Sequence, residues 1–214
     1  MLVTEALKKR RSIRAFLPRD VEKEKLETIL ETALQTPSWA NSQPWEVFVA
    51  SGKTLDRIRE GYRQMYDDKV VPKPETPRPT AWSKAAIERL DQLHPDMRRC
   101  CGDAVEQFSS LNQSLFNAPM VIYICMDKVL SSWSLYDIGA FSQSIMLAAM
   151  EHGLSTIPAI TLTNYPDILH KELEIPNNFK VTIGIAIGYS DDSNDINKFI
   201  SSRSPLSQVV RFFD

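Results

Sequence analysis

The sequence predicts a single domain of the α+β class. Helix-like and strand-like segments mix along the 214 residues without the strict strand–helix–strand repetition of a parallel α/β fold. The length suits one domain, and 43% hydrophobic with 24% charged residues is ordinary for a globular protein with a sizeable core. The chain has no internal repeat. We therefore expect one domain over residues 1–214.

The first part of the chain contains four predicted elements. They are a short helix, an amphipathic helix, a strand and a third helix, over residues 4–11, 21–35, 45–50 and 53–68. Thr4 is expected to cap the first helix. The second helix has apolar residues at helical spacing from Leu26 to Leu34, and Pro37 ends it.

A proline-rich stretch, VVPKPETPRPT, follows the third helix. Its four prolines exclude a regular helix or a central strand. Helical patterns resume over residues 81–93 and 96–115. A plain linker is one interpretation. We interpret residues 62–111 as a mobile, lid-like excursion from the single domain, with an alternative in which its aromatic residues simply pack it onto the body.

The second part of the chain continues the mixture of elements. We expect a buried strand, an apolar helix, an extended segment, a short helix and a central strand, over residues 119–126, 137–152, 153–160, 165–173 and 180–189. The apolar helix suits a central position or a subunit interface. The last residues, including Val209, Val210, Phe212 and Phe213, need burial, so the tail is expected to dock, for example on a second subunit.

Composition disfavours several classes of protein. The net charge of -2 and the pI near 6.0 give no basic stripe for nucleic acid. No segment is long and apolar enough to suggest a membrane span, and no secretory signal is visible. The three cysteines lack disulfide spacing, so we expect a reducing, cytoplasmic location. The cysteines also lack zinc spacing and the three histidines show no ligand pattern, so we expect no metal site.

The segment KKRRSIRAF concentrates positive charge near the N-terminus. Arg10, Arg11, Ser12 and Arg14 offer planar guanidinium forks and a hydroxyl, which together suit the oxygens of one phosphate group. A solvated basic face or a nucleic-acid patch would account for the same residues. Spacing alone does not decide between these interpretations.

A second polar segment is TPSWANSQPW, between the amphipathic helix and the following strand. Two prolines stiffen this loop, and Ser38, Asn41, Ser42 and Gln43 offer donors and acceptors that suit a heterocycle. The neighbouring Trp39 and Trp45 could cover a flat ring. Turn capping by Asn and Ser is an alternative explanation.

These motifs together resemble the nitroreductase family. RRSIR and PSWANSQPW stand in the family's order and spacing, and the later segments GLSTIPAITL, the strand ending IAIGY, and SRSPLSQVVRF resemble the rest of its pattern. The resemblance implies an α+β fold with a central mixed or antiparallel sheet flanked by helices. It also implies a homodimer that exchanges C-terminal extensions and holds two FMN molecules at its interface.

The resemblance carries roles onto individual positions. The family's segment that holds the FMN phosphate and ribityl chain corresponds to Arg10, Arg11, Ser12 and Arg14. The family's phosphate-binding arginine from the tail corresponds to Arg203. The loop that a second subunit lays against the flavin matches Pro37, Ser38, Trp39 and Asn41. The segment along the isoalloxazine, where a backbone N–H faces N5, matches Pro158, Ala159, Ile160 and Thr161. Trp39 and the apolar segment IPAIT depart from the usual family pattern.

The resemblance implies a ping-pong oxidoreductase. NAD(P)H is the co-substrate, and nitroaromatics, quinones or other electron-poor small molecules are the acceptors. The flavin carries the chemistry, so no catalytic side chain is expected. Reductive dehalogenation or flavin-consuming chemistry on the same fold is an alternative. A non-enzymatic nucleic-acid-binding module built around the basic N-terminus is a more remote one.

Overall fold

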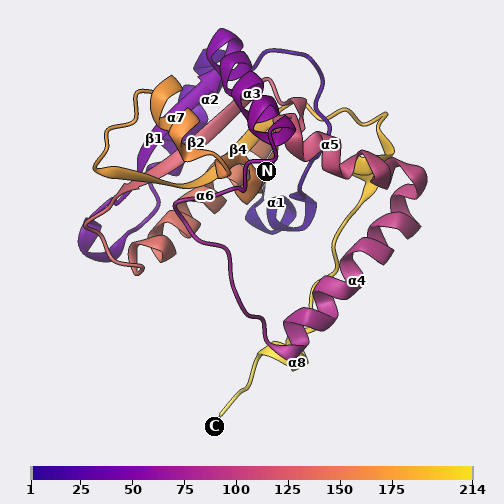
Figure 1. Ribbon diagram of the computed structural model, residues 1–214. Helices are drawn as coiled ribbons and strands as arrows, with labels where there is room; N and C mark the ends of the chain where they lie inside the picture. The colour runs from indigo at the N-terminus through magenta and orange to yellow at the C-terminus, as the bar shows by residue number, and fades with distance from the viewer. Residues whose placement is uncertain (1, 214) are drawn as a thin grey trace.

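The computed structural model describes residues 2–213 and shows a four-stranded sheet between two layers of helices (Figure 1). The strands are β1 (Glu46–Ser51), β2 (Met120–Asp127), β3 (Ser155–Ala159) and β4 (Phe179–Gly188). Their order across the sheet is β1-β2-β4-β3, and each neighbouring pair is antiparallel. The α+β class predicted from the sequence is confirmed, and the sheet is antiparallel.

Helices α2 (Lys23–Ala33) and α6 (Ser134–Glu151) cover one face of the sheet. Ile29 of α2 and Phe141 of α6 are fully buried in the same cluster as Ile122 of β2. Burying a side chain of this size stabilises a fold by about 1.5–3 kcal/mol. The apolar face that the sequence assigns to α2 therefore holds it on the sheet.

Helices α3 (Gly52–Asp67) and α7 (Pro166–Glu172) belong to the opposite layer. Leu55 of α3 and Leu169 of α7 pack in one cluster with Tyr123 of β2, and all three are almost inaccessible to solvent. Alternate side chains of β2 thus pack against the two helix layers, which explains why the whole strand is apolar.

β4 changes its alternation at a β-bulge. Ile124 of β2 pairs with Ile183, whereas the next residue, Cys125, pairs with Val181. Thr182 is the extra residue, and its hydroxyl donates to the Ile124 carbonyl at 2.6 Å. A bulge reverses which side chains face each layer. Val181 therefore packs with the α3 layer while Ile183 packs with the α2 layer.

The excursion contains one long helix where two were predicted. Helix α4 (Lys84–Cys101) continues through Pro95, and a 3-10 segment then leads to α5 (Phe108–Gln113). The predicted break before residue 96 is wrong. Proline costs about 3 kcal/mol inside a helix, but on an exposed helix water can bind the carbonyl that it leaves free. Gly102, with φ of 53°, ends α4.

Helix α4 and the C-terminal segment project together from the body (Figure 1). The tail contains the short helix α8 (Leu206–Val209), and its last aromatic residues, Phe212 and Phe213, are 82% and 92% exposed. The burial expected for this tail does not occur within the chain itself. Large apolar side chains left exposed on an extended arm are typical of an interaction surface.

Helix α1 (Val3–Lys9) begins earlier than predicted. Leu2, not Thr4, occupies the N-cap position, so that prediction is wrong. The Glu5 carboxylate accepts a hydrogen bond from the Leu2 N–H at 3.4 Å, which is the reciprocal half of a capping box, while Leu2 has no side-chain acceptor for the helix N–H groups.

Candidate functional site

The basic N-terminal segment extends the sheet at the outer edge of β3. Ser12 forms a parallel bridge with Thr156, and the Ile13 N–H donates to the Thr156 carbonyl at 3.1 Å. Further along, Phe16 bridges Ser190, which follows β4. The segment that carries the arginines is therefore held as an additional short strand, next to the segment that contains residues 158–161.

Asn197 fixes this arrangement from the far end of the chain. Its Oδ1 accepts the N–H groups of Arg14 and Ala15 at 2.7 and 3.2 Å. Its Nδ2 donates to the carbonyls of Ala15 and Asp191 at 2.7 and 2.9 Å. Asn197 is buried, so these four bonds satisfy a costly polar group. Sequence analysis missed Asn197 because its partners lie far away in sequence.

Two arginines from opposite ends of the chain come together here. Burial and the nearby positive charge of Arg203 lower the pKa of Arg10 below the usual range of an arginine. Arg203 donates only to neutral acceptors, the carbonyls of Ser201 and Ser202 and the Ser201 hydroxyl. Among the described residues, no carboxylate lies within ion-pair distance of Arg10 or Arg203. Such a cluster is electrostatically unfavourable until an anion binds.

Arg10 and Arg11 also line a cavity of about 510 Å³ beside β3. Ser155 and Thr156 contribute to the same wall, and Asp192 also contributes to the lining without forming an ion pair with either arginine. The Nε of Arg11 is buried and has no hydrogen-bond partner among the described residues. A buried donor without an acceptor indicates a missing ligand or water.

Arg14 lies beside two aromatic rings. Its guanidinium lies 5.7 Å from the ring centres of Phe108 and Phe199, and its Nη1 donates to the Ser12 carbonyl at 3.1 Å. Burial lowers the pKa of Arg14, and Cys101 opposes this in part. Its Nε is also buried without a partner. Thus the structure brings Arg10 to Arg203, while Arg14 packs between two aromatic rings.

The segment with Pro158, Ala159, Ile160 and Thr161 ends β3 and enters a 3-10 turn, η4 (Ile160–Thr163). The Thr161 hydroxyl donates to Asn112 Oδ1 at 3.1 Å, so helix α5 of the excursion touches this segment. Close packing under the turn depends on Gly184, since a Cβ at that position would lie 2.5 Å from the Leu162 Cβ. The turn therefore lies directly on β4.

The loop with Pro37, Ser38, Trp39 and Asn41 lies before β1, at the other edge of the sheet. Two strands separate β1 from β3, which corresponds to on the order of 14 Å across the sheet. The structure therefore does not bring this loop to the arginine cluster of the same chain. Trp39 is 69% exposed, so the loop presents its indole outward.

The same loop is strained and anchored. Ala40, Asn41 and Gln43 have φ of 49°, 56° and 44°, in the region that favours glycine. The buried carboxylate of Asp137, in the first turn of α6, accepts the Trp39 N–H at 3.3 Å. Sequence analysis missed Asp137. Strain of this kind persists when surrounding contacts impose it, and it concentrates at functional sites.

The described residues contain no group of three or more His, Cys, Asp and Glu side chains that could hold a metal ion. Within residues 2–213, no helix is both long and apolar enough to cross a membrane.

Comparison with known proteins finds relatives that match nearly the whole chain. The chain is 29% identical to nitroreductase NfnB of Mycolicibacterium smegmatis over 96% of its length and 90% of the relative. It is 27% identical to a 4-nitrobenzoate reductase of Pseudomonas putida, covering 95% and 92% of the two chains. The solved structure of FMN-dependent NfnB from Mycobacterium smegmatis with NADPH superposes with a TM-score of 0.90, at 28% identity and 99% and 97% coverage.

A model of one protein family matches most of the chain. The match covers residues 7–189 and includes the basic segment, the loop before β1, and the segment at the end of β3. The chain belongs to the nitroreductase family.

Proposed function

We propose that this protein is an FMN-dependent oxidoreductase that uses NAD(P)H to reduce nitroaromatics, quinones or related electron-poor acceptors. The observation that carries the proposal is the cavity beside β3 that Arg10 and Arg11 line, in which the buried Nε of Arg11 has no partner among the described residues. The positive charge of Arg203 also acts on Arg10. The relatives support it, since one is a nitroreductase, one a 4-nitrobenzoate reductase, and one a solved FMN-dependent enzyme with NADPH.

The residues fit an oxygen-rich anion such as the flavin phosphate. Two buried guanidinium nitrogens, Nε of Arg11 and of Arg14, have no acceptor among the described residues. A phosphate bound by Arg10, Arg11 and Arg203, with Ser12 and Arg14 toward the ribityl chain, would supply acceptors for this surplus of donors. FMN, when bound, supplies hydride chemistry that no side chain can provide.

In the proposed reaction, the protein itself positions the flavin and the substrates and excludes water from them. The segment 158–161 offers rigid backbone at the end of a strand, held by Asn112 through Thr161. For a nitro acceptor, the first two-electron reduction would consume one NAD(P)H and one proton, release NAD(P)⁺, and convert the nitro group to a nitroso group and water. We assign no catalytic acid or base to this chain.

We further propose that two copies form a homodimer. The loop with Pro37, Ser38, Trp39 and Asn41 lies on the wrong edge of the sheet for its own site, but it is free to reach the site of a second copy. The exposed tail, with Phe212 and Phe213, supports exchange of C-terminal arms. Sedimentation of the intact chain and of a chain ending at residue 200 tests this. We expect a dimer for the first and a weakened dimer for the second.

A cytoplasmic location and a lid role for residues 62–111 complete the proposal. Cys100, Cys101 and Cys125 are free thiols, which supports a reducing compartment. The contact between Asn112 and Thr161 supports the lid role, since it joins α5, which continues from the excursion, to the site. Deleting residues 70–80 should change acceptor preference, and unchanged preference would argue against a lid.

One experiment tests the central claim. The purified protein should absorb as a bound oxidised flavin and be yellow. It should oxidise NADH or NADPH in the presence of nitro compounds or quinones, and a panel that includes halogenated phenols separates reductive dehalogenation. A colourless protein that binds no added FMN, and that binds nucleic acid in a salt-sensitive manner, would overturn the proposal.

A further inference from the structure

A second cavity, of about 770 Å³, lies between α3, the proline-rich segment and the turn that follows β3. Thr161, the last residue of the segment at the candidate flavin site, forms part of its lining. A cavity of this size holds a small organic ligand. The cavity therefore adjoins the proposed flavin site through Thr161. Neither the basic N-terminal segment nor Arg203 lines the cavity.

Three tyrosines give this cavity an aromatic wall, Tyr62, Tyr66 and Tyr165. Tyr62 is buried and donates its hydroxyl to the Leu162 carbonyl at 2.7 Å. Tyr165 meets the Tyr62 ring edge-on, with centres 5.0 Å apart, and donates to the Val70 carbonyl at 3.2 Å. These bonds fix the two rings, so the wall is pre-formed for a flat ligand.

Two cations face the same cavity without a carboxylate partner. Arg78 donates from Nη2 to the neutral Asn164 Oδ1 at 2.8 Å, and the side chain of Lys69 has no partner among the described residues. Asp67 also lines the cavity and forms no ion pair with either of them. By contrast, the arginines of helix α3, at positions 57, 59 and 63, all pair with carboxylates. An oriented but unneutralised guanidinium is suited to an anionic ligand.

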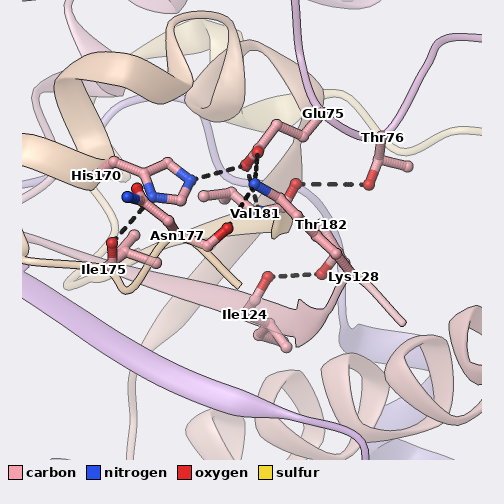
Figure 2. A network of polar contacts seen from close by, with 9 residues as sticks. All are labelled: Glu75, Thr76, Ile124, Lys128, His170, Ile175, Asn177, Val181 and Thr182. Carbon is pink, nitrogen blue, oxygen red and sulfur yellow. Dashed lines mark hydrogen bonds and ion pairs between the residues drawn. The ribbon is translucent and has the colours of Figure 1, made fainter. Parts of the chain in front are cut away.

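The wall that carries Arg78 is held firmly although it is a loop. Figure 2 shows Glu75 as the centre of this anchorage: Oε2 accepts the Val181 N–H at 2.7 Å and meets His170 Nε2 at 3.1 Å. Lys128 Nζ lies 3.3 Å from the other carboxylate oxygen. The Lys73 N–H adds a bond to the Asn164 carbonyl at 3.0 Å. These contacts hold the loop at Lys73 and Glu75, and the bond to Asn164 orients the exposed guanidinium of Arg78.

We propose that this cavity selects electron acceptors that consist of an aromatic ring with an anionic substituent, such as a carboxylate, and that Lys69 and Arg78 determine this specificity. The proposal rests on the proposed function, because it names the acceptor class of the same site. The tyrosines contact the ring, the two cations bind the anionic group, and Thr161 marks the side on which reduction takes place.

Steady-state kinetics with 4-nitrobenzoate and neutral nitrobenzene test this assignment. The Arg78→Gln and Lys69→Gln variants should each raise KM for 4-nitrobenzoate about tenfold, the loss expected for one charge-assisted hydrogen bond, with kcat little changed. KM for nitrobenzene should stay constant. The Lys53→Gln control removes an exposed charge from the same helix as Tyr62 and should change neither value. Added salt should raise KM for 4-nitrobenzoate alone.

Binding of benzoate, followed by calorimetry on the wild type and on the Arg78→Gln variant, needs no turnover. Tighter binding of benzoate than of benzamide, lost in the variant, supports the proposal even if the protein reduces no nitro compound. Equal affinity for the two ligands overturns it, while reduction of nitrobenzene would leave the proposed function standing. A rise in KM for NADPH, with 4-nitrobenzoate unaffected, assigns the cations to the electron donor and also overturns the proposal.

Discussion

The arginine cluster beside β3 and the Glu75 network beside β4 both join segments that are distant in sequence, but only the second is electrically complete. Glu75 faces His170, Lys128 and the Val181 N–H, so its negative charge is satisfied on several sides (Figure 2). Arg10 faces another cation, Arg203. The first cluster therefore suits the anion of the proposed function, whereas the second links segments of the chain to one another.

The direction of each pKa shift expresses the same difference. Burial raises the pKa of Glu75, but the hydrogen bonds from Val181 and His170 outweigh it, and the net pKa lies below the usual carboxyl range. The surroundings therefore favour the charged form of Glu75. For Arg10, burial and Arg203 both lower the pKa, so the surroundings disfavour its charged form. The proposed anion site and the structural network therefore differ in whether each charge has a partner of opposite sign.

The largest expected effect is loss of FMN affinity on removing the arginines that lack a partner. Arg10→Ala and Arg203→Ala should each weaken FMN binding about tenfold to a hundredfold, because each deletes a charge-assisted bond of about 1.5–3 kcal/mol. Titration of the apoprotein by flavin fluorescence measures the dissociation constant.

Arg211→Ala is the matched control, since Arg211 lies in the same tail and donates only to the carbonyls of Ser207 and Val210. FMN at about 100 times its dissociation constant should also stabilise the wild type by about 2.7 kcal/mol. Equal FMN affinity in all three variants would show that the cluster has another purpose.

A smaller effect is expected from the complete network. Glu75→Ala should lower the free energy of unfolding by about 1–3 kcal/mol, because it leaves the Nε2 of His170 and the Val181 N–H without their partner. Chemical denaturation measures this loss. Glu31→Ala, on the exposed side of α2, should change stability by less than about 0.5 kcal/mol. FMN affinity should be retained by Glu75→Ala, and its collapse would erase the distinction between the two clusters.

The loop that contains Trp39 belongs to neither cluster, and its bond to Asp137 can be tested separately. Asp137→Ala removes the acceptor for the Trp39 N–H and should cost about 1 kcal/mol of stability. Asp167→Ala, which removes an exposed carboxylate from the first turn of α7, controls for the helix-dipole contribution. Thermal unfolding compares the two. If both variants lose the same stability, the bond to Trp39 contributes nothing.

The smallest expected effect concerns the exposed carboxylate of Glu22, which also has hydrogen-bond and ion-pair partners. The hydroxyl of Tyr189 donates to Glu22 at 2.6 Å, and this bond is the main cause that lowers the pKa of Glu22 to about 2. A carboxyl whose folded pKa is depressed contributes stability above its unfolded value and loses it as pH falls through the folded value. The contribution should therefore disappear between about pH 4.5 and about pH 2.

Titration of the Glu22 carboxyl by NMR measures this shift. The Tyr189→Phe variant removes the donor and should return the pKa of Glu22 toward the ordinary carboxyl range. An unchanged pKa in that variant would assign the shift to Lys25 and Arg19, which also interact with Glu22.

Local pattern determined much of this protein. The apolar stripe of α2 and the continuous apolar runs of β2 and β4 place those elements within one or two residues of their observed bounds. Such periodicity reports which face each element buries, and burial is the dominant favourable term in folding. Short motifs in the family's order also indicated the nitroreductase family, which the family match over residues 7–189 confirms.

Local sequence pattern did not predict the features that depend on contacts between residues distant in sequence or on solvent exposure. Nothing near residue 95 indicates that α4 continues through a proline, because the solvent exposure of the helix makes this tolerable. Nothing near residue 14 predicts that its guanidinium lies between Phe108 and Phe199.

The sequence by itself determined the fold class, the main elements and the family, since these follow from periodicity and from the order of short motifs. Only the tertiary structure decided that Arg10 meets Arg203, that Asn197 and Asp137 hold the site segments, and that Arg78 faces a tyrosine-lined cavity. The physical reason is range. Backbone propensity acts within a few residues, whereas hydrogen bonds and charge pairing act between any groups that folding brings within a few ångströms.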